Sequence, residues 1–445
     1  MTVVHLPAAQ ASTAIERSST IDAVRAVSLL VVVVLHALMV GAWTGPDGGL
    51  LTRVALSGET WFAPVTWVLQ VMPLFFIAGG FAALLQWRRL RGRGASAGEY
   101  VSGRVRRLAV PAVAMVATVG AVLAVARALG ADASLLAEAG LRIGQPLWFL
   151  AVYSGVTALV PAMAWLHDRR PVLTLAGLAV GALAVDVTSR LTGLDIGYVN
   201  LVFVWLLMQQ LGFVMLDGPM GAWPRGRLLA GVGISLALLV LCVGLGWSPD
   251  MIENLNPPTF ALVLLGAAQF FALQLLRPWL DRVTARPAAA RIAARVGGGA
   301  MSVYLWHMPL IMALVAGMWV LGLPLPEPHS EGWWISRLPW LAVIFAAVVP
   351  FAARIARIDR PIAQRSRQIA SRLGLARIPL GLRAPLAVLL TISGTVIALL
   401  IGVDAPLPAL IAAGLLGAAA IVSSAALSSI PVPSAPARRG DRPAR

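Results

Sequence analysis

The sequence predicts an all-α fold, a polytopic transmembrane helical bundle, and three observations support this class. Hydrophobic residues make up 59% of the 445 residues and charged residues only 12%, against roughly 25% charged in soluble domains. Apolar runs of about 17 to 25 residues, the length that crosses a bilayer core as helix, recur along the chain. The ten-residue alternation of a membrane β-barrel does not occur. A water-soluble globular enzyme is therefore excluded.

Twelve apolar segments are expected to form the membrane-spanning helices. They lie at about 23–42, 62–86, 108–129, 147–166, 171–189, 197–216, 228–247, 258–277, 299–321, 334–353, 385–403 and 406–427. The first run is too long and too interrupted for the apolar core of a signal peptide, so we expect it to stay in the protein as the first helix.

The arginines predict how these helices are oriented. The formal charge of +16 arises from 35 arginines and no lysine. If the N-terminus is cytoplasmic, 30 of the 35 arginines fall on the inner side of the membrane, as the positive-inside rule requires. We therefore expect a multi-pass protein of the cytoplasmic (inner) membrane with both termini inside. Nucleic acid is not needed as a partner to explain the charge.

Composition divides the chain into five expected segments. They are a cytoplasmic N-terminal segment at 1–20, a membrane core of about ten helices at 21–355, a basic amphipathic cytoplasmic linker at 356–384, two additional transmembrane helices at 385–428, and a disordered basic tail at 429–445. The stretch from Arg354 to Arg383 holds eight arginines and one acid, Asp359. It is expected to form a helix on the anionic cytoplasmic leaflet.

The first predicted helix carries the clearest candidates for chemistry, Arg25 and His36. Ionisable groups within the membrane usually face a cavity or a partner. The two residues are eleven positions apart, which places them on nearly one helix face about 16 Å apart along the axis. A neutral imidazole, with an unperturbed pKa of about 6.5, is suited to accept a proton from a hydroxyl. The structural alternative is that Arg25 pairs with Asp22 and His36 makes a hydrogen bond within the bundle.

Four further motifs follow in order along the chain. They are Met72-Pro73-Leu74-Phe75-Phe76-Ile77-Ala78-Gly79-Gly80-Phe81, Arg104-Val105-Arg106-Arg107 with Pro111, Pro146-Leu147-Trp148-Phe149-Leu150, and Ser302-Val303-Tyr304-Leu305-Trp306-His307-Met308-Pro309-Leu310. Together with Arg25 and His36, they resemble the motifs of the integral-membrane acyltransferase-3 family. The resemblance covers about residues 20 to 355.

The resemblance implies an acyl-CoA-dependent O-acyltransferase of the cell envelope. Such an enzyme moves an acyl group, commonly acetyl, from a cytoplasmic coenzyme A thioester to a hydroxyl of a glycan, a lipid or a small secreted molecule. His36 and Arg25 match the essential histidine and arginine of the family. Arg104 and Arg107 match its arginine pair, and His307 matches its late histidine.

These matches assign expected roles. His36 is expected to act as general base and Arg25 to position the donor, with an acyl-histidine intermediate as the alternative route. Arg104 and Arg107 are expected to bind the donor, since guanidinium groups match phosphates, although positive-inside topology alone also explains them. The candidate cavity-lining residues are Trp148, Tyr304, Trp306 and His307.

Two features limit the expected ligands and the resemblance itself. No metal and no bound cofactor are expected, because the five histidines are scattered and the one cysteine lies in an apolar run. Acyl-coenzyme A is expected as a co-substrate. The family often has Ser-Gly-Phe where this chain has Gly79-Gly80-Phe81, and the chain continues beyond the family core.

The main alternatives are a twelve-helix secondary transporter and a glycan or lipid exporter. Twelve spans with both ends inside fit a transporter equally well. Such transporters often have a long central loop, whereas here the loop after the sixth span is about eleven residues long. Consumption of acetyl-coenzyme A by the purified protein would discriminate. The exclusive use of arginine and the richness in alanine indicate a GC-rich bacterial genome.

Overall fold

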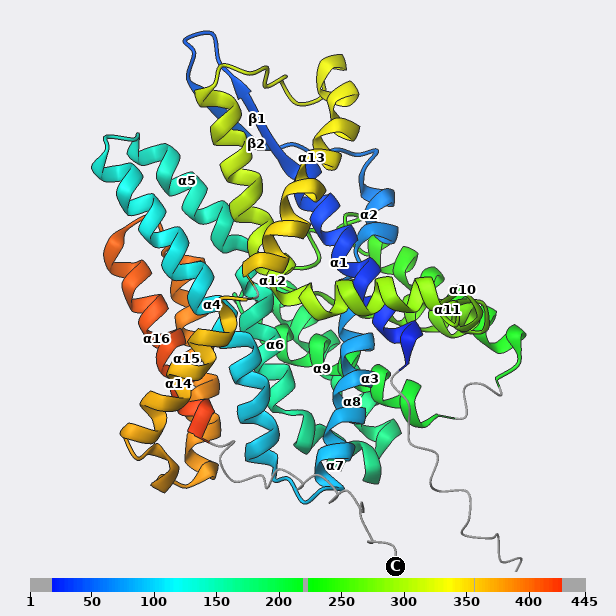
Figure 1. The fold of residues 1–445 in the computed structure, drawn as a ribbon. Helices are drawn as coiled ribbons and strands as arrows, with labels where there is room; N and C mark the ends of the chain where they lie inside the picture. The colour runs from blue at the N-terminus through cyan, green and yellow to red at the C-terminus, as the bar shows by residue number, and fades with distance from the viewer. Residues whose placement is uncertain (1–17, 219–222, 356, 426–445) are drawn as a thin grey trace, which may run out of the picture.

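The computed structural model describes residues 18–218, 223–355 and 357–425, and it confirms the all-α polytopic bundle (Figure 1). Within this part of the chain, eleven helices are long and apolar enough to cross a membrane, and one bent pair raises the number to twelve if it forms a single span. Each of the twelve predicted spans falls on one of these. The expected tail at 429–445, and all but the last residues of the expected segment 1–20, lie outside the described residues.

The elements of the described residues follow one another along the chain in a fixed order. They are α1 (Ser19–Met39), β1 (Val40–Thr44), β2 (Leu50–Val54), α2 (Ala63–Leu69), α3 (Met72–Arg91), α4 (Ala97–Ala128), α5 (Ala133–Gly144), η2 (Gln145–Leu147), α6 (Trp148–Ala158), α7 (Val160–Arg169), α8 (Pro171–Thr192), η3 (Gly197–Val199), α9 (Asn200–Asp217), α10 (Arg225–Gly244), α11 (Phe260–Thr284), α12 (Pro287–Val320), α13 (Glu331–Ile355), α14 (Asp359–Arg372), η5 (Leu375–Arg377), α15 (Leu380–Leu400) and α16 (Pro406–Ser424).

The fourth predicted span is a broken helix. The segments Ala133–Ala158 and Val160–Arg169 meet at an angle of 51°. Pro161 lies in the first turn of α7, where it has no N–H to continue the hydrogen bonds of α6. The bend turns α7 toward α3 and α9, where Arg88 forms ion pairs with Asp168 at 2.9 Å and with Asp217. The hydropathy of the sequence predicts the length of such an apolar segment, but it does not predict a bend within it.

A β-hairpin that was not anticipated follows α1. Strands β1 and β2 pair antiparallel, with Val40 opposite Val54, and form the one sheet within the described residues. Asp47 stabilises the turn by accepting a hydrogen bond from the backbone N–H of Gly49 at 3.1 Å. The Arg53 guanidinium donates to the backbone carbonyl of Pro328 at 3.0 Å, which ties the hairpin to the loop before α13.

Glycines allow α3 and α9 to pack in direct contact. A Cβ atom at Gly80 would clash with the backbone of Gln209, and one at Gly212 would clash with the backbone of α3. Close approach of this kind is typical of small residues in membrane helices. Beside the contact, Phe76 stacks on Trp205 with ring centres 4.3 Å apart.

The C-terminal helices α15 and α16 pack directly on the core rather than apart from it (Figure 1). A Cβ atom at Gly120 of α4 would lie 2.7 Å from the Cβ of Ala409 in α16. Arg127 at the end of α4 forms an ion pair with Asp404 at 3.1 Å.

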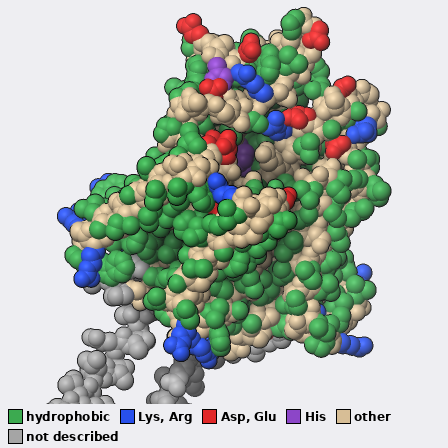
Figure 2. All heavy atoms as spheres, turned by 180° about the vertical axis from the view of Figure 1, so that it is seen from behind, with side chains coloured by type: hydrophobic (Ala, Val, Ile, Leu, Met, Phe, Trp, Pro, Cys, Tyr) green, Lys and Arg blue, Asp and Glu red, His purple; other side chains and the backbone are tan. Residues whose placement is uncertain are grey.

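Charge separates along the long axis of the molecule. Figure 2 shows the acidic side chains of the face drawn in its upper half, the end of the hairpin, together with some basic ones, whereas its lower half shows basic side chains alone. This separation agrees with the orientation that the arginine count favours.

Candidate active site

One large cavity of about 960 Å³ lies among α1, α3, α4, α6, α12 and α14. Its volume is near the upper end of the usual range for small-molecule sites, about 300 to 1,000 Å³. Apolar and aromatic side chains line one part of it: Leu29, Val32, Met72, Phe75, Phe149 and Tyr153. These residues come from helices far apart in the sequence, so the cavity exists only in the assembled bundle.

Arginines give the same cavity a strongly positive charge. Seven arginines of the described residues line it: Arg25, Arg89, Arg104, Arg106, Arg107, Arg360 and Arg367. Two aspartates, Asp22 and Asp359, also line it, so the formal charge of the lining is +5. Among the described residues, no ion pair involves any of these arginines. Such a cavity suits a ligand with several negative charges.

The bundle brings together three arginines that the sequence analysis singled out, Arg25, Arg104 and Arg107. The Arg25 guanidinium lies 5.8 Å from the centre of the Phe75 ring, and its Nε is buried without a hydrogen-bond partner. The Arg104 Nε donates to the Tyr100 hydroxyl at 3.4 Å. Arg107 is close enough to Arg25 and Arg104 for electrostatic repulsion. An anion bound among the three would offset this repulsion.

His36 lies on α1 one helical turn beyond Val32, where the lining of the cavity on this helix ends. The Nδ1 atom of His36 is 2.8 Å from the carbonyl oxygen of Val32. Because a carbonyl only accepts hydrogen bonds, the neutral ring carries its hydrogen on Nδ1 and leaves Nε2 as an acceptor. This tautomer is the one that a general base acting through Nε2 requires.

His307 of α12 lies beside His36, with ring centres 4.9 Å apart and ring planes at 62°. Its Nδ1 is 2.5 Å from the carbonyl oxygen of Tyr304, so its Nε2 is also an acceptor. That Nε2 is buried without a hydrogen-bond partner. The structure thus places two imidazoles, each with a free acceptor nitrogen, at one point in the middle of the bundle.

Of the four candidate cavity-lining residues, Tyr304 lines the cavity. Its hydroxyl donates to the backbone carbonyl of Pro146 and so links α12 to η2, directly before α6. Trp148, Trp306 and His307 are not among the described residues that line it. Trp148 packs near Trp205, and Trp306 packs against Phe351 of α13. His36 is half-buried, and it too lies outside the lining.

Several cavity residues were not anticipated as site residues: Arg89, Arg106, Tyr153, Arg360 and Arg367. Arg360 and Arg367 are seven residues apart, a spacing that places them on one helix face. The same spacing fits a helix lying on lipid headgroups, so the sequence did not distinguish the two. Only the packing of α14 on α4 and α16 brings this face to the cavity.

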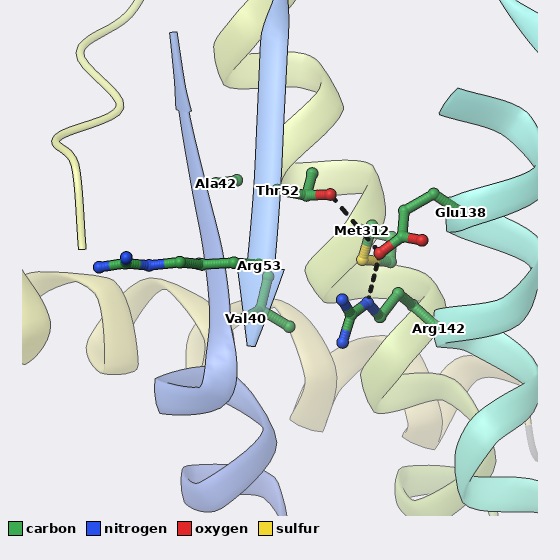
Figure 3. A pocket seen from close by; sticks show the side chains of 8 residues that line it. Val40, Ala42, Thr52, Arg53, Glu138, Arg142 and Met312 are labelled. Carbon is green, nitrogen blue, oxygen red and sulfur yellow. Dashed lines mark hydrogen bonds and ion pairs between the residues drawn. The ribbon is translucent and has the colours of Figure 1, made fainter. Parts of the chain in front are cut away.

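A second, much smaller pocket of about 10 Å³ lies between the hairpin, α5 and α12 (Figure 3). Glu138 accepts a hydrogen bond from the Arg142 Nε at 2.7 Å and one from the Thr52 hydroxyl at 3.5 Å. Figure 3 shows Thr52 and Arg142 directed toward Glu138, whereas Arg53 points away from it. A space of this volume holds about one water molecule. We therefore interpret it as a structural contact between the hairpin and α5.

Comparison with known families identifies the region that carries most of the residues lining the cavity. The family model described as an acyltransferase domain, that of the acyltransferase-3 family, matches residues 19–356. No curated protein and no solved structure matches the chain. The matched region includes Arg25, His36, the arginine pair and His307. It ends before α14, α15 and α16.

Proposed function

Since the chain belongs to the acyltransferase-3 family, we propose that it transfers an acyl group, most simply acetyl, from acyl-coenzyme A to a hydroxyl. The acceptor would be a glycan, a lipid or a small secreted molecule, and the enzyme would act in the bacterial inner membrane. The observation that carries the proposal is the cavity with a formal charge of +5, which reaches along α1 to within one turn of His36. Multi-pass helices and the family match support a membrane acyltransferase.

The two parts of the cavity match the two parts of the donor. Coenzyme A has a phosphorylated nucleotide end and an uncharged pantetheine arm that bears the thioester. The guanidinium groups of Arg25, Arg104 and Arg107 are suited to the phosphates. Apolar walls around Leu29 and Val32 are suited to the arm. The donor would enter from the arginine-rich end, which the positive-inside rule assigns to the cytoplasm.

In the proposed reaction, His36 acts as general base. Its Nε2 takes the proton of the acceptor hydroxyl while the hydroxyl oxygen attacks the thioester carbonyl carbon. The carbon–sulfur bond then breaks, the new ester forms, and the proton on His36 passes to the leaving thiolate. His307 supports this role because its buried Nε2 can accept a hydrogen bond from protonated His36. The acceptor hydroxyl would approach the His36 ring from the side that faces away from the cavity.

Replacement of the base tests the proposal. In purified protein in lipid nanodiscs, His36→Ala is expected to lower acetyl transfer by about 10² to 10⁴-fold, the usual contribution of a general base. Binding of coenzyme A should persist, because His36 lies outside the lining of the cavity. Acetyl-coenzyme A consumption and equilibrium binding are the measurements, with an unchanged melting temperature as the control for folding. Near-normal transfer by this variant would contradict the role of His36 as general base and would leave it a structural role only.

The wild-type protein provides the wider test. Failure to bind or consume acetyl-coenzyme A with any acceptor class, in protein that is folded, would contradict the proposal and favour a transporter or an exporter. Rapid release of one equivalent of coenzyme A without acceptor would instead favour the acyl-histidine route over direct transfer.

A further inference from the structure

Helix α14 contributes to the cavity although it lies beyond the acyltransferase match, which ends at residue 356. Arg360, Ala363 and Arg367 line the cavity together with Asp359. Positions 360, 363 and 367 follow the spacing of one helix face. One stripe of α14 therefore faces the cavity along two turns.

Packing fixes the position of this stripe. Helix α14 contacts α16 and α4, and Ser366 and Ala370 are buried in that contact. Arg365 and Arg372 lie on other faces of the helix and do not line the cavity, although all four arginines are exposed. The helix thus presents two pairs of arginines, each pair seven residues apart, of which only one pair faces the cavity.

The cavity arginines form two groups that meet at Arg106 and Arg107 of α4. Arg104 and Arg107 lie near Arg25 of α1. Arg106 lies near Arg367 of α14 and also near Arg107, close enough to both for electrostatic repulsion. Asp359, the residue before Arg360, is the acid that α14 contributes to the lining, and its Oδ1 is buried without a hydrogen-bond partner. Like charges held together in this way favour binding of an anion between them.

Coenzyme A has two sites of negative charge, the diphosphate bridge and the phosphate on the 3′-hydroxyl of its ribose. The pantetheine arm follows directly from the diphosphate. Because Arg25 lies on the same helix as His36, the group around Arg25 is the one that the diphosphate reaches when the thioester approaches His36. The second group, with Arg106 and Arg367, is then the one available for the 3′-phosphate.

We propose that Arg106, Arg360 and Arg367 bind the 3′-phosphate of the donor, so that α14 is a donor-binding element added to the acyltransferase core. This inference rests on the proposed function, because it takes acyl-coenzyme A as the donor. Guanidinium groups on two helices would hold the phosphate by charge-assisted hydrogen bonds. The alternative, that these arginines bind anionic lipid headgroups, is an outcome of the test below.

The two arginine pairs of α14 provide a matched experiment. The cavity pair is changed in the double variant Arg360→Gln/Arg367→Gln, and the control is Arg365→Gln/Arg372→Gln, with the same spacing, helix and loss of charge. Binding of coenzyme A and of 3′-dephospho-coenzyme A is measured with the full chain in phosphatidylcholine nanodiscs. A neutral lipid removes any contribution from anionic headgroups.

The wild-type protein is expected to bind coenzyme A about tenfold more tightly, or better, than the 3′-dephospho form. The cavity variant should lose this preference and bind both ligands as the wild type binds the 3′-dephospho form. The control variant should keep the preference, and all three proteins should have similar melting temperatures.

Other results would overturn the inference. Wild-type protein that transfers acetyl but binds both ligands equally would refute the 3′-phosphate site and leave the proposed function intact. Equal losses in the cavity and control variants would indicate a general charge effect. An unchanged preference in the cavity variant, together with weaker association with phosphatidylglycerol vesicles, would assign the pair to lipid. Wild-type protein that binds neither ligand would contradict the proposed function itself.

Discussion

At the scale of single residues, backbone hydrogen bonds decide which atoms of the two histidines are available for chemistry. His36 and His307 each direct Nδ1 at a carbonyl oxygen of their own helix. A carbonyl cannot donate, so both rings are left with Nε2 as the acceptor. A histidine in a sequence has no defined tautomer, whereas these contacts define one. The arginines of the cavity complete the site with fixed positive charge, since a guanidinium stays protonated.

At Arg25, a substitution can separate the effect of the planar guanidinium group from the effect of its positive charge. Arg25→Lys keeps the charge but loses the planar guanidinium, whose Nε is buried beside the cavity. We expect donor affinity to fall by about tenfold, because lysine cannot form the bidentate hydrogen bonds of arginine. Turnover at saturating donor should fall less than affinity. Equilibrium binding and steady-state transfer measure the two effects.

Arg93→Lys is the control, since Arg93 is exposed after α3 and does not line the cavity. Equal effects of the two substitutions would show that Arg25 contributes only to overall charge, and its role in donor positioning would be withdrawn.

At the scale of elements, two adjacent glycines of α3 differ in the space that their surroundings leave for a side chain. A Cβ atom at Gly79 would meet only the Tyr153 ring and hydroxyl, at 3.5 and 3.7 Å, which is ordinary van der Waals contact. A Cβ atom at Gly80 would clash with the backbone of α9 at Gln209. Gly79 is also the position where the family often has serine. The chain can therefore accommodate the family residue at the first glycine but no side chain at the second.

Serine substitutions at the two positions test this difference. Gly79→Ser should fold with nearly unchanged stability, and its hydroxyl would lie near Tyr153 at the wall of the cavity. Gly80→Ser should destabilise the protein by about 1 to 3 kcal/mol, the usual effect of overpacking. Thermal unfolding in detergent measures both. If the Gly80→Ser protein is as stable as the Gly79→Ser protein, then α3 and α9 can move apart without loss of stability.

The pair α15 and α16 stabilises α4 without lining the cavity. None of the described residues from 380 to 424 contributes to the lining. A chain ending at Pro379 should therefore insert and retain acyl transfer at saturating donor, with weaker donor binding because α14 loses its contact with α16. It should also melt at least about 5 °C lower, because the small-residue face of α4 around Gly120 loses its partner. Transfer activity and thermal unfolding of the shortened chain are the measurements.

The full-length Arg127→Gln variant provides the comparison, since it removes the ion pair with Asp404 and keeps both helices. A shortened chain that is stable and folded yet inactive would place α15 and α16 in the active site.

At the scale of the whole molecule, the separation of charge predicts the topology. Labelling of single cysteines in a Cys242→Ala background tests it. Ala131→Cys, between α4 and α5, should react with an impermeant maleimide in intact cells, because this end carries few arginines. Arg93→Cys and Ala376→Cys, in the arginine-rich connections, should react only after lysis. Labelling of either inner position in intact cells would contradict the predicted orientation, and with it the proposed entry of the donor from the cytoplasm.

The sequence by itself determined the helical class, the positions of the twelve apolar segments and the order of the motifs. These features depend on local quantities, namely the apolar length needed to cross a bilayer and the placement of arginines outside it. The spacing of Arg25 and His36 along α1 was predictable for the same reason, since helix geometry fixes it, but of the two only Arg25 lines the cavity. The fourth span was found as a length, but its 51° bend was not.

Only the tertiary structure decided how these parts form a site. The contact of His36 with His307 joins residues 271 positions apart, and the cavity draws its wall from six helices. Residues that meet in this way share no local pattern, because their contact depends on how α1, α12 and α4 pack. The same holds for Arg360 and Arg367, whose spacing suits a lipid surface and a cavity equally. The packing of α14 on α4 and α16 turned that face toward the cavity, since burial of Ser366 and Ala370 fixes the rotation of the helix.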